Sequence, residues 1–217
     1  MAQDHYDLVV IGSGPAGQKG AVAAAKLGKR VALIERKGQI GGVCLHTGTI
    51  PSKTLREGIL YLTGYRQREF YGPDYTVKEK ITLPDLRFRV QKVLERELGV
   101  ITDQLRRNDI QLLAGTARFL DAHTLEVKGD EGTSQLTAEY VLVACGTRPA
   151  SCPDIPFDGK RIFLSDQFGQ LEKIPRDLIV VGGGVIGLEF ASMLTALNIN
   201  ITLIDQRPTI LDFVDQE

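Results

Sequence analysis

Residues 7–35 read DLVVIGSGPAGQKGAVAAAKLGKRVALIE, and this stretch decides the fold. The unbroken apolar run Leu8–Ile11 predicts a strand whose two faces are both covered, as in a parallel sheet. Small residues follow and predict a helix from Pro15 to about Leu27, after which Arg30–Ile34 predicts a second strand. The stretch therefore predicts one strand–helix–strand unit of an α/β fold.

The turn between the first strand and the helix has the spacing G-x-G-x-x-G, formed by Gly12, Gly14 and Gly17. In that pattern the first glycine permits a tight turn, the second lets backbone approach a pyrophosphate, and the third allows close packing of helix on strand. The helix directs its positive end at the phosphates. Glu35 ends the second strand, where its carboxylate can accept hydrogen bonds from ribose hydroxyls. A dinucleotide site is predicted, and a merely structural turn is the alternative.

The same pattern returns at residues 178–206, LIVVGGGVIGLEFASMLTALNINITLIDQ. Two apolar runs, Leu178–Val181 and Ile201–Ile204, predict strands on either side of a helix of small residues. The repeated positions are the glycines and the terminal acid, namely Gly182, Gly184, Gly187 and Asp205. Two dinucleotide sites in one chain indicate two cofactors that are used together.

Asp205 bears on the identity of the second nucleotide. A carboxylate at this position favours a free 2′-hydroxyl and repels a 2′-phosphate, which points to NAD. Arg207 lies two residues further on and could pair with a phosphate, so NADP stays open. The alternative for Arg207 is a solvated loop charge.

The residues between the two repeats predict a helical insertion followed by strands. Residues from about 52 to 108 have mainly helical patterns. From Ile110 short strands are predicted, and the last of them is Tyr140–Ala144. Gly146, just after it, suits a close approach of backbone to a cofactor. The proline-rich stretch Arg148–Pro156 predicts a linker.

Composition excludes several classes of protein. The formal charge of −1 argues against a nucleic-acid surface, and no apolar run approaches the roughly 20 residues that a membrane span needs. Three cysteines at irregular spacing favour neither a disulfide framework nor a metal site. We expect a cytoplasmic protein with no membrane or nucleic-acid partner.

Five motifs occur in a characteristic order, GSGPAG, GGVCLHTGTIPSK, GTARF, ACGTRP and GGGVIGLEFA. Together they resemble the FAD-dependent pyridine-nucleotide disulfide oxidoreductases over the whole chain. The resemblance implies two Rossmann-like, doubly wound units: an FAD-binding domain at 1–150, with the helical insertion, and the start of an NAD(P)-binding domain at 151–217. It assigns the adenosine half of FAD to the first turn and to Glu35, and NAD(P)H to the second turn. Further residues implied to meet FAD are Gly42, Ala117, Gly146 and Lys53.

The resemblance also implies a reaction centre. The lysine of the P-S-K motif, Lys53, would lie beside the flavin N5 and pair with Glu189 of the second turn's helix. The family's disulfide pattern is C-x-x-x-x-C, and here Cys44 is followed by Thr49 in the second place. A hydroxyl has no accessible redox couple, so reduced flavin would discharge onto a nicotinamide or an external acceptor.

Three functions fit this pattern. The first is hydride transfer between NADPH and NAD through FAD, which the retained GTIPSK motif favours. The second is an NAD(P)H diaphorase derived from a dihydrolipoamide-dehydrogenase-like ancestor, and the third is a non-enzymatic flavin- or nucleotide-binding fragment. Family chains are about twice as long and carry a C-terminal dimerisation domain. We therefore expect the second unit to be truncated and the complete protein to be a homo-oligomer.

Overall fold

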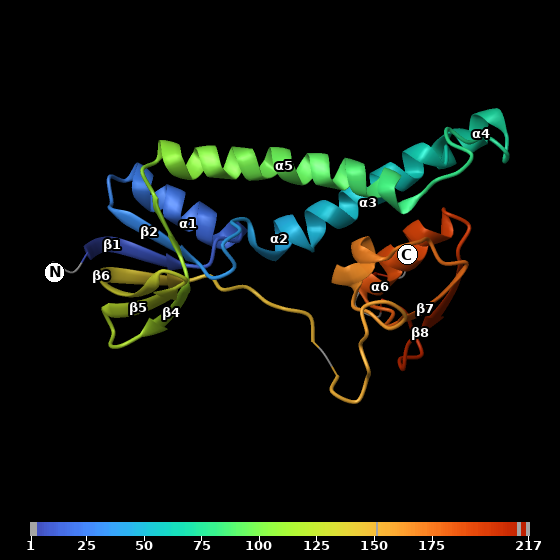
Figure 1. Ribbon diagram of the computed structural model, residues 1–217. Coiled ribbons are helices and arrows are strands. Elements are labelled where there is room, and N and C mark those ends of the chain that lie inside the picture. Colours follow the sequence, from blue (N-terminus) through green and yellow to red (C-terminus); the bar gives the residue numbers. More distant parts are fainter. Residues whose placement is uncertain (1–3, 151, 212–213, 216–217) are drawn as a thin grey trace. The chain divides into compact units, whose positions relative to one another are not determined.

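The computed structural model describes residues 4–150, 152–211 and 214–215 (Figure 1). The predicted α/β fold is confirmed. In chain order the strands, helices and 3-10 helices (η) are β1 (Asp4–Ile11), α1 (Pro15–Lys26), β2 (Val31–Glu35), α2 (Gly42–His46), α3 (Thr49–Leu62), η1 (Tyr65–Gln67), α4 (Arg68–Tyr71), α5 (Leu83–Arg107), β3 (Gln111–Ala114), β4 (Thr116–Phe119), β5 (Thr124–Gly129), β6 (Gly132–Val143), η2 (Ser165–Gln170), β7 (Asp177–Val181), α6 (Val185–Thr195) and β8 (Asn200–Ile204).

The chain forms two compact units, one of Met1–Pro51 with Val93–Pro149 and one of Ser52–Lys92 with Ala150–Glu217. The boundary between them falls inside helices α3 and α5. The second unit thus includes residues 52–92, which lie in the stretch that the sequence pattern assigned to the first domain as an insertion. The division into an FAD-binding and an NAD(P)-binding domain stays a prediction, because compactness does not identify the nucleotide.

The first unit is built on a six-stranded sheet with the order β3-β2-β1-β6-β5-β4. The strands β3, β2, β1 and β6 run parallel, and β5 and β4 are antiparallel additions. Strand β6 has two successive partners, because residues 132–137 pair with β5 and residues 136–143 pair with β1. This long strand joins the antiparallel strands β5 and β4 to the edge of the parallel part of the sheet.

Both faces of the central strands are covered, as the apolar run predicted. On one face, Val10 and Leu33 pack with Ala21 of α1 and Leu105 of α5. On the other face, Val9 and its neighbours pack with side chains of β5 and β6 rather than with a helix. Strands therefore supply the cover on that face, and the carboxyl ends of β1 and β2 remain available beside the start of α1.

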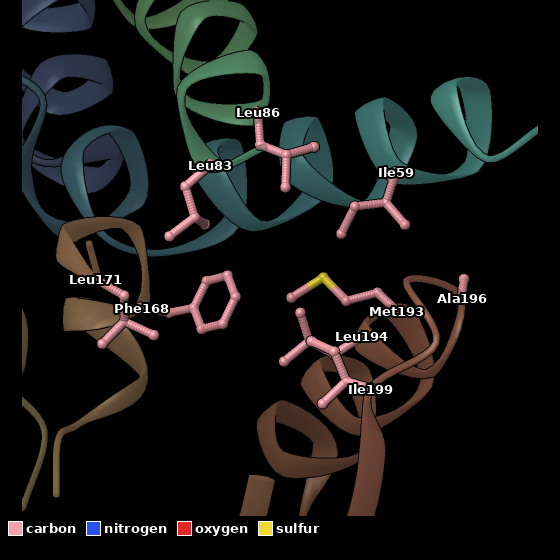
Figure 2. Close-up of a cluster of buried hydrophobic side chains, with 9 residues drawn as sticks. All are labelled: Ile59, Leu83, Leu86, Phe168, Leu171, Met193, Leu194, Ala196 and Ile199. Atoms are coloured by element: carbon pink, nitrogen blue, oxygen red, sulfur yellow. The ribbon is translucent and has the colours of Figure 1, made fainter. Parts of the chain in front are cut away.

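The second unit has a different core, in which helices meet around the fingerprint helix α6. Strands β7 and β8 form a two-stranded parallel sheet. Figure 2 shows the side chains that converge from α3, α5, η2 and the α6 region. They are Ile59, Leu83, Leu86, Phe168, Leu171, Met193, Leu194, Ala196 and Ile199. Arg87 of α5 adds hydrogen bonds from its guanidinium to the carbonyl oxygens of Gly169 and Leu171.

Two predicted boundaries are corrected. The second strand is Val31–Glu35 rather than Arg30–Ile34, because Glu35 still pairs with Ala114 of β3. The strand predicted at Tyr140–Ala144 begins at Gly132 and ends at Val143, since β5 extends its pairing toward the N-terminus. The first helix, Pro15–Lys26 with Leu27 as its C-cap, confirms the predicted helix from Pro15 to about Leu27.

Helix α5 begins with a cap in which Thr82 donates to Asp85. The backbone N–H and the hydroxyl of Thr82 both donate to Oδ2 of Asp85, at 2.8 and 2.7 Å, and Lys78 Nζ lies 2.6 Å from Oδ1. Together these hydrogen bonds, the one from Lys78 first, lower the pKa of Asp85 to about 2. The hydrogen bond from the Thr82 N–H to the Asp85 carboxylate is one half of a capping box, and the sequence TLPD has the spacing for it.

Candidate functional site

The first glycine-rich turn holds the backbone of β1, β6 and α1 close together. Gly12 has a φ of +106°, and a methyl group there would overlap the carbonyl oxygen of Ala144 at the end of β6. A methyl group on Gly17 would overlap the carbonyl oxygen of Gly12. The first and third glycines are therefore required for packing, as their positions in the motif predicted.

Glu35 is the last residue of β2, and its carboxylate accepts hydrogen bonds from the glycine-rich turn and from the residues that follow β2. Its Oε2 accepts from the backbone N–H of Ser13 at 3.2 Å and from the Ser13 hydroxyl at 2.5 Å. Its Oε1 accepts from the backbone N–H of Lys37 at 2.9 Å. Burial raises the pKa of Glu35, but the combined hydrogen bonds from Ser13 and Lys37 lower it more, so the carboxylate stays ionised.

Ser13 is the residue that the sequence reasoning missed. It is fully buried, and its hydroxyl and carbonyl oxygens also accept the backbone N–H of Gly41, at 3.1 and 3.2 Å. Gln18 of α1 donates from Nε2 to the same carbonyl at 2.6 Å. The only available signal was a hydroxyl between the first two glycines, where the second turn has Gly183.

The Gly41–Gly42 turn lies directly on the first glycine-rich turn. Gly42 has a φ of +63°, and a methyl group there would come within 2.8 Å of the Cα of Gly14. The structure thus brings Gly12, Gly14, Gly17, Glu35 and Gly42 together at the carboxyl ends of β1 and β2.

Two further predicted residues lie on the chain segments that flank this group. Ala117 is in β4, and the strand is joined to the acid because the N–H of Gly115 donates to the carbonyl oxygen of Glu35 at 3.0 Å. Gly146 follows β6 with a φ of +64°, and a methyl group there would meet no described atom within 4 Å. Their contact with a cofactor stays a prediction.

The second glycine-rich turn repeats the backbone geometry of the first. Gly182 has a φ of +107°, and its N–H donates to Ile204 at 2.8 Å, as Gly12 donates to Ile34 at 2.9 Å. A methyl group on Gly187 would overlap the carbonyl oxygen of Gly182. The predicted pattern of Gly182, Gly184, Gly187 and Asp205 is thus brought together in the second unit.

Asp205 accepts backbone hydrogen bonds in the same arrangement as Glu35, which we call a carboxylate clasp: one from the residue after the first glycine and one from the residue two positions beyond the acid. Asp205 has one added partner, the Arg207 side chain. Its Oδ2 accepts from Gly183 N–H at 2.5 Å and its Oδ1 from Arg207 N–H at 2.8 Å. The guanidinium of Arg207 completes the set through Nε on Oδ1 at 3.0 Å and Nη2 on Oδ2 at 3.2 Å. The hydrogen bonds from Arg207, side chain first, hold the pKa of Asp205 well below its usual range. Arg207 is therefore an ion-pair partner of Asp205 rather than a solvated loop charge.

Both fingerprint helices begin without a side-chain cap among the described residues. Gly14 and Gly184 are their N-cap residues, and a methyl group on either would meet no described atom within 4 Å. Helix α5, in contrast, has its Thr82–Asp85 cap. Exposed N–H groups beside open space at a helix start suit an anion, so both turns fit the diphosphate of a dinucleotide.

Lys53 and Glu189 are brought together in the second unit, as the resemblance implied. The Nζ of Lys53, in α3, lies 2.5 Å from Oε1 of Glu189, in α6. The hydroxyl of Ser52 lies 3.4 Å from the same oxygen. The lysine side chain is 58% exposed and the glutamate side chain 16%, so the ammonium remains accessible while its partner is largely covered.

Cys44 and Thr49 lie on successive helices of the first unit. Cys44 is a half-buried free thiol in α2, and Thr49 is the first residue of α3. Cys44 lines a pocket of about 180 Å³ together with Pro15 of α1 and Ile101 of α5. Cys145 and Cys152 are exposed free thiols.

No helix in the part of the chain that the structure describes is long and apolar enough to cross a membrane. Over the same ranges, no three His, Cys, Asp or Glu side chains gather in a group that could hold a metal ion.

Residues 6–217 match the family described as pyridine nucleotide-disulphide oxidoreductase. Among curated proteins, the chain is 50% identical over 214 residues to the soluble pyridine nucleotide transhydrogenase of Mycobacterium tuberculosis (strain ATCC 25177 / H37Ra), an alignment that covers 98% of this chain and 46% of the relative. It is 39% identical over 218 residues to the protein of the same name from Serratia proteamaculans, covering 99% and 46%. The chain thus spans about half the length of these relatives.

Solved structures agree on the fold. LpdA from Mycobacterium tuberculosis superposes with a TM-score of 0.84 at 31% identity, covering 95% of this chain and 46% of that one. The Cu(II) complex of the HOCl-induced flavoprotein disulfide reductase RclA from Escherichia coli gives a TM-score of 0.81 at 28% identity, covering 99% and 45%.

Proposed function

We propose that this chain, which belongs to the pyridine nucleotide-disulphide oxidoreductase family, is part of a flavoenzyme that transfers hydride between NADPH and NAD. The paired glycine-rich turns carry the proposal, because each has an open, uncapped helix start and a carboxylate clasp. The names of the curated relatives support the same reaction. A cytoplasmic homo-oligomer, with no nucleic-acid or membrane partner, belongs to the proposal as well.

The first turn is suited to hold the adenosine diphosphate half of FAD. The N–H groups at the start of α1 would donate to the pyrophosphate, and the open space at Gly14 would leave room for it. A carboxylate has about four lone-pair positions, and Glu35 uses three of them within the described chain. The remaining position on Oε1 can accept a ribose hydroxyl.

Bound FAD would supply the hydride acceptor and donor, and its binding and orientation are tasks of this chain. Lys53 would place its ammonium at the reacting edge of the flavin, where negative charge develops on reduction. Glu189 fixes the position of this ammonium through the 2.5 Å hydrogen bond. The second turn would hold the nicotinamide nucleotide, with its diphosphate at the start of α6.

The pair Cys44 and Thr49 decides where the electrons leave. A thiol can form a disulfide with another thiol but not with a hydroxyl, so this position offers no dithiol relay. We therefore propose that hydride leaves toward a second nicotinamide rather than toward a disulfide substrate.

The test uses the intact, flavin-loaded protein with NADPH and thio-NAD, whose reduced form absorbs at its own wavelength. Steady reduction of thio-NAD supports transhydrogenation. Turnover with quinones or dyes but not with thio-NAD would show that the protein is a diaphorase and would refute transhydrogenation. A protein whose flavin is reduced by neither nucleotide is a binding module, and brisk reduction of lipoamide or glutathione would refute the absence of a sulfur relay.

A further inference from the structure

Ser13 connects the last residue of β2 with the turn that begins α2. Its hydroxyl donates to Oε2 of Glu35 at 2.5 Å and accepts the backbone N–H of Gly41 at 3.1 Å. Its backbone N–H donates to the same Oε2 at 3.2 Å. Its carbonyl oxygen accepts from the N–H of Gly41 at 3.2 Å and from Nε2 of Gln18 at 2.6 Å. Each polar group of Ser13 therefore has a partner, and the hydroxyl alone bonds to both Glu35 and Gly41.

The hydroxyl is both donor and acceptor in one chain of hydrogen bonds. Because its hydrogen is donated to a carboxylate, its oxygen accepts the N–H of Gly41, and in such a chain each hydrogen bond polarises the next. Ser13 is fully buried and Glu35 is 8% exposed, so both groups are shielded from water. Loss of the hydroxyl would leave Glu35 with the backbone donors of Ser13 and Lys37, and Gly41 with the longer of its two hydrogen bonds.

The second glycine-rich turn has little room for the same arrangement. Gly183 takes the place of Ser13, and a methyl group on it would come within 3.1 Å of Oδ2 of Asp205. The shorter acid lies closer to its turn, since Oδ2 of Asp205 is 2.5 Å from the Gly183 nitrogen, whereas Oε2 of Glu35 is 3.2 Å from the Ser13 nitrogen. The hydroxyl that links an acid to a following turn thus belongs to the first unit.

We propose that Ser13 is a positioning residue for FAD, whose hydroxyl holds the Glu35 carboxylate and the Gly41–Gly42 turn in one fixed arrangement. Glu35 is the proposed acceptor for the ribose. Gly42 lies against Gly14 at the open start of α1, where the diphosphate is proposed to bind. Ser13 thereby couples the two parts of the site for the adenosine diphosphate half. This inference rests on the proposed assignment of FAD to the first turn.

The hydroxyl also makes this part of the site resistant to acid. Burial, the largest single effect, raises the pKa of Glu35, and the hydrogen bond from the Ser13 hydroxyl is the largest of the effects that lower it. The backbone hydrogen bonds from Lys37 and Ser13 and the charge of Arg36 lower the pKa less. Without the hydroxyl, burial is opposed less, so the pKa of Glu35 rises. A protonated carboxyl is a weaker acceptor for a ribose hydroxyl, so FAD should then bind more weakly as the pH falls.

The experiment measures the dissociation constant of FAD for the intact protein at about pH 7.5 and about pH 5, from the fluorescence of flavin released on dilution. Relative to the wild type, Ser13→Ala should raise this constant about tenfold at the higher pH, as expected for one lost hydrogen bond to a charged group. The ratio of the two constants should grow by about a further threefold or more at the lower pH. Ser134→Ala removes a hydroxyl from an exposed position of β6 and should match the wild type at both pH values.

Gln18→Met separates positioning from a general loss of stability. It removes the hydrogen bond to the Ser13 carbonyl and leaves the hydroxyl on Glu35 in place. This variant should melt at a lower temperature than the wild type, but the ratio of its FAD dissociation constant to that of the wild type should be the same at both pH values.

A Ser13→Ala protein whose ratio is one, or whose ratio stays constant between the two pH values, would overturn the inference. If Ser13→Ala does not fold, Ser13→Gly removes the hydroxyl and introduces the residue type that the second turn has at this place, and the same two outcomes decide. Wild-type protein that binds no FAD would refute the proposed assignment of the first turn itself, which separates the two failures.

Discussion

The ammonium of Lys53 lies 2.5 Å from the carboxylate of Glu189, although 136 positions separate the two residues in the chain. Helices α3 and α6 both contribute side chains to the buried cluster of the second unit (Figure 2). The sequence alone placed each residue early in a helix, and the fold brings the helices together.

Lys53→Ala should slow reduction of the flavin by NADPH roughly 100-fold, as expected when one preorganised charge at a reacting centre is removed. Flavin content should remain that of the wild type, because Lys53 is not part of the first glycine-rich turn. Stopped-flow absorbance measures the rate. Lys53→Arg should recover part of the rate, and Lys160→Ala, in an exposed loop, is the control. An undiminished reduction rate in Lys53→Ala would remove this residue from the reaction.

Gly14→Ala and Gly17→Ala should fail in different ways. A methyl group on Gly14 meets no described atom but lies at the open start of α1, so this variant should fold with an unchanged melting temperature and lose FAD. A methyl group on Gly17 overlaps the carbonyl oxygen of Gly12 and should destabilise the fold by about 1–3 kcal/mol. Flavin absorbance and thermal unfolding of the apoprotein separate the two results. A stable, flavin-loaded Gly14→Ala protein would contradict the assignment.

The second turn offers the same contrast with a different readout. Gly184→Ala should keep FAD and the fold but weaken NAD⁺ and NADP⁺ binding about tenfold or more, because its methyl group also points into open space at a helix start. Gly187→Ala should unfold more easily, since its methyl group overlaps the carbonyl oxygen of Gly182. Calorimetric titration with each nucleotide is the measurement. Loss of flavin from Gly184→Ala would indicate that the assignment of the two turns is reversed.

The cap of α5 should appear as a pH-dependent contribution to stability. The folded pKa of Asp85, about 2, lies below its ordinary value of 3.8, so the ionised form stabilises the native state above about pH 4. This stabilisation should be lost as the pH falls from about 4 to 2. Urea unfolding of the wild type and of Asp85→Asn should show a stability difference that is constant above pH 4 and shrinks below it. A difference that persists unchanged to pH 2 would refute this account of the cap.

Much of the geometry of the two glycine-rich turns could be predicted because it is local. The glycine spacing, the terminal acids Glu35 and Asp205 and the start of each fingerprint helix follow from 30-residue stretches in which every element contacts its neighbour in sequence. The packing roles of Gly17 and Gly187 could be predicted for the same reason. Each lies against the backbone of the first glycine of its own turn.

The rest depends on contacts that no short window contains. The length of β6 was underestimated because its first half is held by β5 rather than by its own apolar pattern. Residues 52–92 pack with α6 through side chains such as Ile59, Leu86 and Met193, which read as ordinary helical apolar positions. Ser13 and Arg207 were undervalued for a related reason, since their partners depend on side-chain rotamers that composition does not reveal.

The placement of Lys53 matters for anyone who wishes to exchange nucleotide specificity by building chimeras. A graft that begins at the predicted start of the second domain, position 151 in the sequence, would carry Glu189 but leave Lys53 behind, because residues 52–92 belong to the same compact unit as α6. A transplant that moves residues 52–92 together with the segment from residue 150 onward keeps both partners of the ion pair and all residues of the apolar cluster. The unit to exchange in a chimera is thus made of two separate stretches of the chain.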